Sequence, residues 1–253
     1  MRTRAKLTLA AAGASAGLFL SACQQLGVPA ANATPTMDAV AEIVQADLPP
    51  GLSVDEIRPS PVSGLLELRV GTDILYVTQD GKTIVRGSML DRASKRDLTA
   101  VRRAEVVAEM LAAVPLDEAH VYPTNAAKPR RIFVFTDPSC PYCQRFHEQV
   151  PSLTAMGVEV VYLGFPREGI GSQPYDQLTA AFCSKDPDAA FDAIMKPGTQ
   201  TDSAGACLSP VDYHFDLARQ LEVSGTPAIF DASGRQIGGY LTAEQLVAAL
   251  EAK

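Results

Sequence analysis

The sequence has no block of basic residues. It contains 22 lysines and arginines against 29 acidic residues, so the formal net charge is −7. Proteins that bind nucleic acid usually gather basic residues on one surface, so nucleic acid is not an expected partner. The acidic balance instead favours solubility.

Long apolar runs are also scarce, and the one that occurs is at the N-terminus. Three basic residues stand in the first six positions, before an uncharged apolar stretch from Leu7 to Leu20. This pattern is typical of a secretory signal and is too short for a stable membrane span. The sequence therefore predicts a signal peptide over residues 1–22 and export of the remaining chain. Residues 23–36, which are small and polar with two prolines, read as a flexible tether.

The signal ends in Leu20-Ser21-Ala22-Cys23, which resembles a bacterial lipobox. In such a signal the cysteine is lipidated and becomes the first residue of the mature chain. The resemblance predicts a lipid anchor on Cys23. The alternative is an ordinary signal cleaved nearby, in which Cys23 has no role.

Cysteine is rare, with five residues in 253. Export leads to an oxidising compartment where thiols pair, and an odd count leaves one thiol over. If Cys23 carries lipid, four cysteines remain. Cys140 and Cys143 can pair locally, which leaves Cys183 with Cys207. The count therefore supports both the lipid on Cys23 and this pairing.

The first part of the mature chain lacks chemistry-bearing residues, because residues 37–90 hold neither cysteine nor histidine. Apolar residues from Met37 to Leu48 follow a helical spacing. Short β-rich runs come next, and Asp80-Gly81 predicts a tight hairpin turn with φ > 0 at both positions. We predict a small α+β domain, helix plus β-meander, over residues 37–97, whose role is structure or association.

A second helical stripe predicts a linker helix over residues 98–117, either a spacer between domains or packed on one of them. Apolar runs at 132–135 and 158–164 are typical of strands buried on both faces. Residues 166–220 are mostly helical in pattern, and two short strands and a terminal helix follow. An α/β domain is therefore predicted over residues 118–253.

The motif Cys140-Pro141-Tyr142-Cys143 follows the first of these strands, and its spacing suits three chemistries. A zinc site needs four ligands, usually as two close pairs, but the other cysteines stand alone and only His147 is near. A structural crosslink would close a very small loop and constrain the unfolded chain little. Both alternatives therefore explain less than a redox pair does.

The redox interpretation uses the position of the motif. Cys140 stands where a helix begins, and helix N-terminal N–H groups and the helix dipole lower a thiol pKa. Pro141 is favoured in a first helical turn. Cys143, one turn on, is placed to resolve a mixed disulfide at Cys140. Asp137 is expected to cap the helix rather than to accept the proton of Cys143, and His147 lies near the same helix face.

A second motif, Ser224-Gly225-Thr226-Pro227-Ala228, precedes a buried strand and is compatible with a cis Thr226–Pro227 bond. Together with the CxxC motif it resembles the thioredoxin fold. That resemblance implies that the cis-proline loop lies against the CxxC motif and binds an extended substrate segment. Thr226 and Pro227, with Pro141 and Tyr142, are the implied substrate-binding residues.

The whole arrangement resembles the DsbC/DsbG family of periplasmic disulfide isomerases, over nearly all of the mature chain. Segments such as Phe135-Thr136-Asp137 and Tyr162-Leu163 carry the likeness. The resemblance implies a homodimer formed through the first domain and a helical insertion in the thioredoxin fold at about residues 166–220. It also implies a structural disulfide between Cys183 and Cys207, no cofactor, and a membrane thiol reductase resembling DsbD as electron donor. The Pro141-Tyr142 dipeptide is more similar to DsbG than to DsbC.

The sequence therefore predicts an enzyme of the periplasm of a Gram-negative bacterium that attacks incorrect disulfides in misoxidised exported proteins and reshuffles or reduces them. A DsbA-like thiol oxidase is one alternative. A DsbG-like reductase or chaperone with few clients is another, and a chaperone without redox activity is a third.

Overall fold

The structure is a computed structural model that describes residues 34–199 and 207–252. The predicted signal peptide, Cys23 and most of the tether lie outside the described residues. Among the residues that are described, no helix is both long and apolar enough to cross a membrane.

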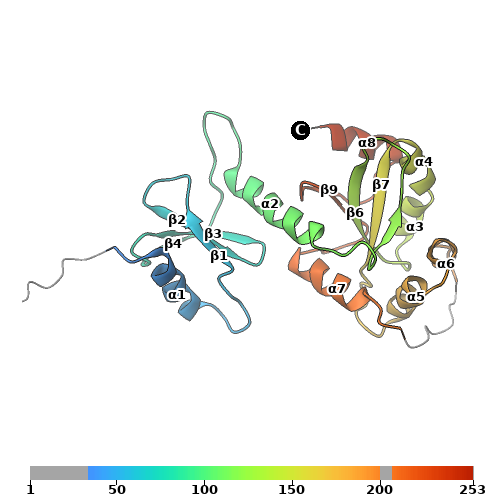
Figure 1. Cartoon of the computed structure of the whole chain (residues 1–253), viewed down its shortest axis with the longest axis horizontal. Coiled ribbons are helices and arrows are strands. Elements are labelled where there is room, and N and C mark those ends of the chain that lie inside the picture. The colour runs from blue at the N-terminus through green and yellow to red at the C-terminus, as the bar shows by residue number, and fades with distance from the viewer. Residues whose placement is uncertain (1–33, 200–206, 253) are drawn as a thin grey trace, which may run out of the picture. The chain divides into compact units, whose positions relative to one another are not determined.

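A four-stranded antiparallel sheet and one helix form the first part of the described chain, residues 37–85 (Figure 1). Helix α1 (Met37–Asp47) starts at Thr36, whose side chain accepts a hydrogen bond from the backbone N–H of Ala39. The strands, in the order β1-β2-β3-β4, are β1 (Glu56–Pro59), β2 (Leu65–Val70), β3 (Asp73–Thr78) and β4 (Ile84–Val85). Val40 and Val44 of α1 are buried against the sheet, whereas Met37, expected on the same buried stripe, is 42% exposed.

The hairpin of β3 and β4 is present, but its turn is looser than the sequence predicts. The backbone N–H of Thr78 donates to the carbonyl of Thr83 (3.0 Å), which closes a loop of four residues rather than two. Gly81 has φ +73°, and Asp80 does not adopt a positive φ. The side chain of Asp80 instead accepts hydrogen bonds from Thr78 and Lys82 inside the loop, so the predicted tight turn is wrong.

Helix α2 (Leu98–Ala112) begins at Asp97, whose side chain accepts from the backbone N–H of Ala100. It ends earlier than the predicted residue 117, since the residues before Pro115 leave the helical conformation. Val106 packs with residues of the first sheet, and Val107 and Leu111 lie in a core shared with the second sheet.

A five-stranded mixed sheet forms the second part, in the order β5-β7-β6-β8-β9. Its strands are β5 (His120–Tyr122), β6 (Arg130–Thr136), β7 (Val158–Gly164), β8 (Ala228–Asp231) and β9 (Gln236–Gly238). Strands β6 and β7 are parallel and the other neighbours antiparallel. Strand β5 has only three residues, too few to show a period, and the sequence pattern did not reveal it.

Helices cover both faces of this sheet (Figure 1). They are α3 (Pro141–His147), α4 (Val150–Ala155), α5 (Gln173–Phe182), α6 (Pro187–Ile194), α7 (Val211–Gln220) and α8 (Ala243–Glu251). In β6, Ile132 and Val134 face a core with α3, α4 and α8, whereas Phe133 and Phe135 face a core with α7. The prediction of a strand buried on both faces is therefore confirmed.

Candidate active site

Cys140 is the residue from which α3 starts. Its backbone is extended, Pro141 occupies the first helical turn, and no side chain caps the helix. The free N–H groups of the first turn therefore remain available to the Cys140 sulfur. The Sγ atom of Cys140 lies 3.2 Å from the carbonyl oxygen of Thr226, and both CxxC thiols are free.

The pKa of the Cys140 thiol is lowered from 9.0 to about 5. The main cause is a hydrogen bond that the Cys143 thiol donates to the Cys140 thiolate, and backbone N–H groups of Cys143 and Tyr142 act in the same direction. Burial alone would raise the pKa, so hydrogen bonding dominates here. Cys140 is therefore a thiolate at neutral pH.

Cys143 is in the opposite state. Its side chain is fully buried, and burial raises the pKa of its thiol, as does its hydrogen bond to Cys140. The pair thus shares one proton, which stays on Cys143 at neutral pH. This arrangement supplies one nucleophile and one protected thiol, as thiol–disulfide exchange requires.

The Thr226–Pro227 peptide bond is cis, and it lies directly before β8. Because β8 pairs with β6 and the CxxC motif follows β6, the sheet brings this loop to Cys140 across 86 residues of sequence. Thr226 and Pro227 thus lie beside Cys140, as the thioredoxin resemblance predicts, and Pro141 and Tyr142 lie in the first turn of α3. The Tyr142 side chain is 54% exposed.

Asp137 does not cap the active-site helix, so that prediction is wrong. Its fully buried carboxylate accepts hydrogen bonds from the backbone and hydroxyl of Ser139, at 2.7 and 2.6 Å. The other carboxylate oxygen accepts from the backbone N–H and the Nε of Arg167, both at 2.9 Å. Asp137 therefore holds the loop that leads into Cys140. The pairing of Arg167 with Asp137 was not predicted, because a contact across 30 residues leaves no local pattern.

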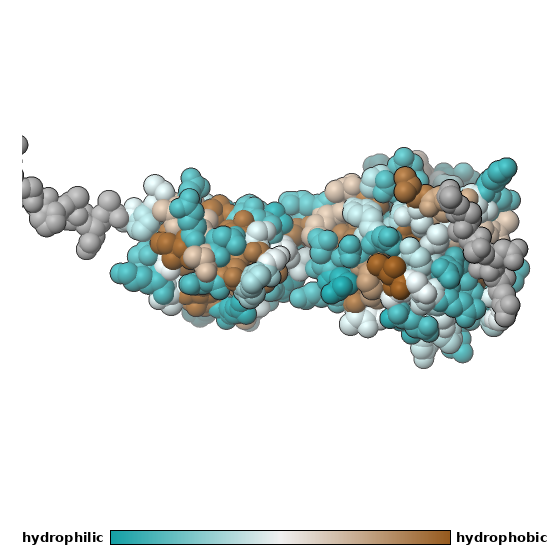
Figure 2. Space-filling model, turned by 90° about the horizontal axis from the view of Figure 1, so that it is seen from below, coloured by the Kyte–Doolittle hydropathy of each residue, from teal (hydrophilic) through white to brown (hydrophobic). Residues whose placement is uncertain are grey.

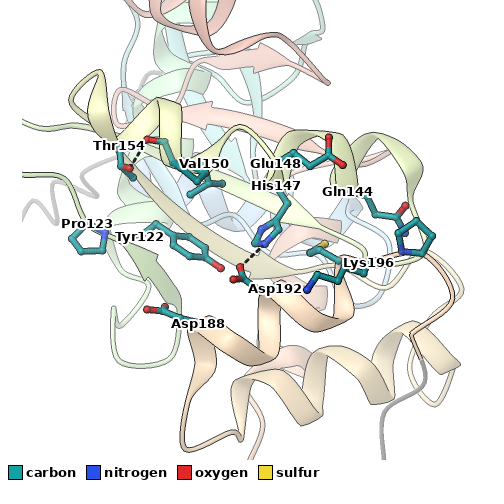
Figure 3. A pocket seen from close by; sticks show the side chains of 13 residues that line it. Tyr122, Pro123, Gln144, His147, Glu148, Val150, Thr154, Asp188, Asp192 and Lys196 are labelled. Atoms are coloured by element: carbon teal, nitrogen blue, oxygen red, sulfur yellow. Dashed lines mark hydrogen bonds and ion pairs between the residues drawn. The ribbon is translucent and has the colours of Figure 1, made fainter.

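Both ring nitrogens of His147 contact residues other than Cys140. One ring nitrogen lies 3.2 Å from the Tyr162 hydroxyl. The other lies 3.0 Å from a carboxylate oxygen of Asp192 on α6 (Figure 3). Burial lowers the pKa of His147. His147 and Asp192 border a groove of about 580 Å³, and neither Cys140 nor Cys143 lines it.

Two more cysteines and two more histidines lie in the described part of the second domain. A disulfide joins Cys183 at the end of α5 to Cys207, with Cα atoms 6.1 Å apart. His120 faces Asp188 at 3.3 Å, and buried His214 accepts a hydrogen bond from the backbone of Gly164. Within residues 34–199 and 207–252, no three His, Cys, Asp or Glu side chains are grouped to hold a metal ion.

Comparison with known proteins identifies two families along the chain. The thioredoxin-like domain family matches residues 116–253, and the N-terminal domain family of disulfide bond isomerase proteins matches residues 31–100. The chain is 34% identical over 190 residues to the thiol:disulfide interchange protein DsbC of Escherichia coli strain K12, covering 75% of this chain and 78% of that protein.

DsbC of Haemophilus influenzae is 32% identical over 226 residues, which covers 89% of this chain and 95% of that protein. The crystal structure of a disulfide interchange protein from Neisseria gonorrhoeae matches with 25% identity and a TM-score of 0.48, over 55% of this chain and 96% of that one. On the strength of the two domain families and the curated relatives, the chain belongs to the DsbC family of thiol:disulfide interchange proteins, which are disulfide isomerases and reductases with a thioredoxin fold.

Proposed function

We propose that Cys140 is the attacking nucleophile and Cys143 the resolving thiol, acting on incorrect disulfides of exported proteins. The observation that carries this proposal is the opposite state of the two thiols: the Cys140 pKa is lowered to about 5, while burial raises that of Cys143. A thiolate beside a protected thiol is suited to attack first and resolve second.

In the first step, the Cys140 thiolate attacks one sulfur of a client disulfide. That S–S bond breaks, a mixed disulfide forms between Cys140 and the client, and the other client sulfur leaves as a thiolate. A different client thiolate can then displace Cys140, which rearranges the client with no net transfer of electrons. This outcome is isomerisation.

In the second outcome, Cys143 loses its proton and attacks the Cys140 sulfur. The client leaves as a dithiol, so it is reduced by two electrons, and Cys140 and Cys143 become a disulfide. The protein must then be reduced again. We propose a membrane thiol reductase resembling DsbD as the donor of these two electrons.

Substrate binding is assigned to the loop and turn around Cys140. The carbonyl of Thr226 is 3.2 Å from the Cys140 sulfur, so a backbone that runs along Thr226 and Pro227 would bring its own cysteine next to Cys140. Pro141 and Tyr142 border the same sulfur from the helix side. The disulfide between Cys183 and Cys207 is proposed to be structural, since it joins the end of α5 to the chain that leads into α7.

The active form is proposed to be a homodimer assembled through residues 37–97. Several large apolar side chains are exposed in this segment, and Figure 2 shows hydrophobic residues on the surface that α1 and the first sheet form. Exposed apolar groups of this kind favour association. The exposed apolar residues of this segment are Met37, Ile43, Leu52, Val62, Ile84, Val85 and Leu90.

We further propose that the protein works in the periplasm of a Gram-negative bacterium, held at a membrane by lipid on Cys23. The basis is the signal-like N-terminus with Leu20-Ser21-Ala22-Cys23 and the periplasmic character of the DsbC family. Mass spectrometry of the mature N-terminal peptide tests the lipid. An unmodified mature chain that begins at another residue would rule it out.

The decisive test of the function is the reactivation of a scrambled multi-disulfide protein in a glutathione buffer. Soluble chain 24–253 is expected to restore activity, and Cys140→Ser to have none. Cys143→Ala is expected to retain isomerisation in part, because client thiols can still release Cys140. If the intact chain only oxidises reduced client and never rescues scrambled client, the protein is an oxidase.

A further inference from the structure

A second tyrosine lies beside the exposed ring of Tyr142. The ring centroids of Tyr142 and Tyr240 are 6.0 Å apart with an interplanar angle of 39°. This separation is within the 4.5–7 Å range of interacting aromatic pairs. The guanidinium carbon of Arg145 stands 5.7 Å from the centroid of the Tyr142 ring. Tyr240 therefore extends an aromatic surface away from the active-site helix.

Tyr240 is brought here by the end of the sheet. Strands β8 and β9 pair with Ile229 opposite Gly238, so the residues after Gly238 run back beside Pro227, which precedes β8. A Cβ built on Gly239 would lie 3.6 Å from the carbonyl oxygen of Pro227. Tyr240 is the next residue, so its backbone borders the cis-proline loop.

The segment is also tied to the helical side of the site. Gln149, between α3 and α4, donates its side-chain amide to the carbonyl of Leu241 (3.3 Å), and its oxygen accepts from the backbone N–H of Ala243 (2.7 Å). Tyr240 is half-buried against the core that contains Cys140 and Cys143. Its position relative to Cys140 is thus held from both directions.

We propose that Tyr142 and Tyr240 form a recognition surface for an aromatic side chain next to the client cysteine that Cys140 attacks. A client segment extended along Thr226 and Pro227 passes between α3 and the end of β9, where the two rings lie. Stacking on these rings favours a planar apolar side chain over a small polar one. Tyr240 is then a specificity residue of the exchange reaction, and this inference rests on the function proposed above.

The test uses two cyclic disulfide peptides that differ only in the residue before one cysteine, phenylalanine or serine. Reduced protein is mixed with each, and the second-order rate of peptide reduction is followed. Each turnover oxidises Cys140 and Cys143 to a disulfide and converts the peptide to a dithiol. Wild type is expected to reduce the phenylalanine peptide about fivefold faster, the size of one aromatic contact.

Tyr240→Ala is expected to bring this ratio close to one, and Tyr240→Phe to keep it. Leu241→Ala is the matched control, because Leu241 packs on the same core but is outside the ring pair, and it is expected to keep the ratio. The thiolate absorbance of Cys140 should titrate alike in all four proteins, which separates recognition from a change at the thiol.

An unchanged ratio in Tyr240→Ala, or a wild type without preference, overturns the inference while leaving the proposed function intact. A wild type that reduces neither peptide overturns the proposed function, and the inference with it. A loss of the ratio in Leu241→Ala as well would assign Tyr240 to general packing and also overturn the inference.

Discussion

The two thiols of the CxxC motif stand one helical turn apart and differ in protonation because Cys143 is buried and because a hydrogen bond joins the pair. Cys143 donates it and Cys140 accepts it, which is the largest cause of the low Cys140 pKa. A hydrogen bond to a charged acceptor contributes about 1.5–3 kcal/mol, which corresponds to about one to two pH units. The identity of residue 143 therefore sets the nucleophilicity of residue 140.

Cys143→Ala is expected to raise the pKa of Cys140 by about one to two pH units, measured from thiolate absorbance during a pH titration. Cys143→Ser keeps a donor and is expected to stay closer to the wild-type value of about 5. In each protein, the rate of alkylation by iodoacetamide should rise through the pH range in which the thiolate absorbance of that protein rises. Equal values for the alanine and serine variants would contradict this account.

Arg167→Met is expected to lower the free energy of unfolding by about 3 kcal/mol, because it leaves the fully buried Asp137 carboxylate without its charged partner. Urea denaturation of the reduced protein measures the loss. The control is Asp137→Asn with Arg167→Met, which removes both charges and should cost less than the sum of the single variants. A cost below about 1 kcal/mol would class the pair as a surface salt bridge.

At the scale of elements, two buried histidines lie where α6 and α7 pack on the sheet: His120 stacks on Phe191 of α6, and His214 of α7 accepts a hydrogen bond from Gly164 of β7. Burial lowers the pKa of His214 on α7 from 6.5 to about 4, and His120 on β5 behaves in the same way. Between pH 6.5 and 4 the unfolded chain is protonated at these positions and the folded chain is not. The unfolded state then binds more protons than the folded state. The contribution of these histidines to the free energy of unfolding is therefore fully present above pH 6.5 and is lost as the pH falls to 4.

The free energy of unfolding is therefore expected to decrease from pH 7 to pH 4, with His214 contributing on the order of 3 kcal/mol. Urea denaturation at a series of pH values measures this slope. His214→Asn keeps an acceptor for the Gly164 N–H. This variant is expected to be less stable than wild type at pH 7, but its free energy of unfolding should change less with pH. An unaltered slope in this variant would mean that other groups control acid unfolding.

At the scale of the whole molecule, the proposed homodimer is expected to depend on the first sheet rather than on the CxxC site. Val85→Lys, which charges an exposed apolar position of β4, is expected to shift a homodimer towards monomer by at least tenfold in the dissociation constant, measured by sedimentation equilibrium. Ile170→Lys places the same charge on an exposed apolar residue of the second part and should leave the dimer intact. Equal effects of the two changes would reject this interface.

Much of the second part follows from local sequence. The apolar runs at β6 and β7, the proline after Cys140 and the Thr242 cap of α8 each act within a few residues, and the structure has all of them. Predictions failed where a side-chain hydrogen bond or ion pair decides the outcome. Asp137 binds Arg167 instead of capping α3, and the Asp80-Gly81 loop follows its side-chain hydrogen bonds rather than a two-residue turn.

By itself, the sequence determined that this chain performs thiol chemistry, because two cysteines at a helix start and a Thr-Pro bond before a strand are local features. Only the tertiary structure decided which distant residues stand beside the two thiols. Cys140 meets Thr226 from 86 residues away, and Tyr142 meets Tyr240 across the end of the sheet. Such contacts depend on strand pairing and packing, which no period of 2 or 3.6 residues encodes.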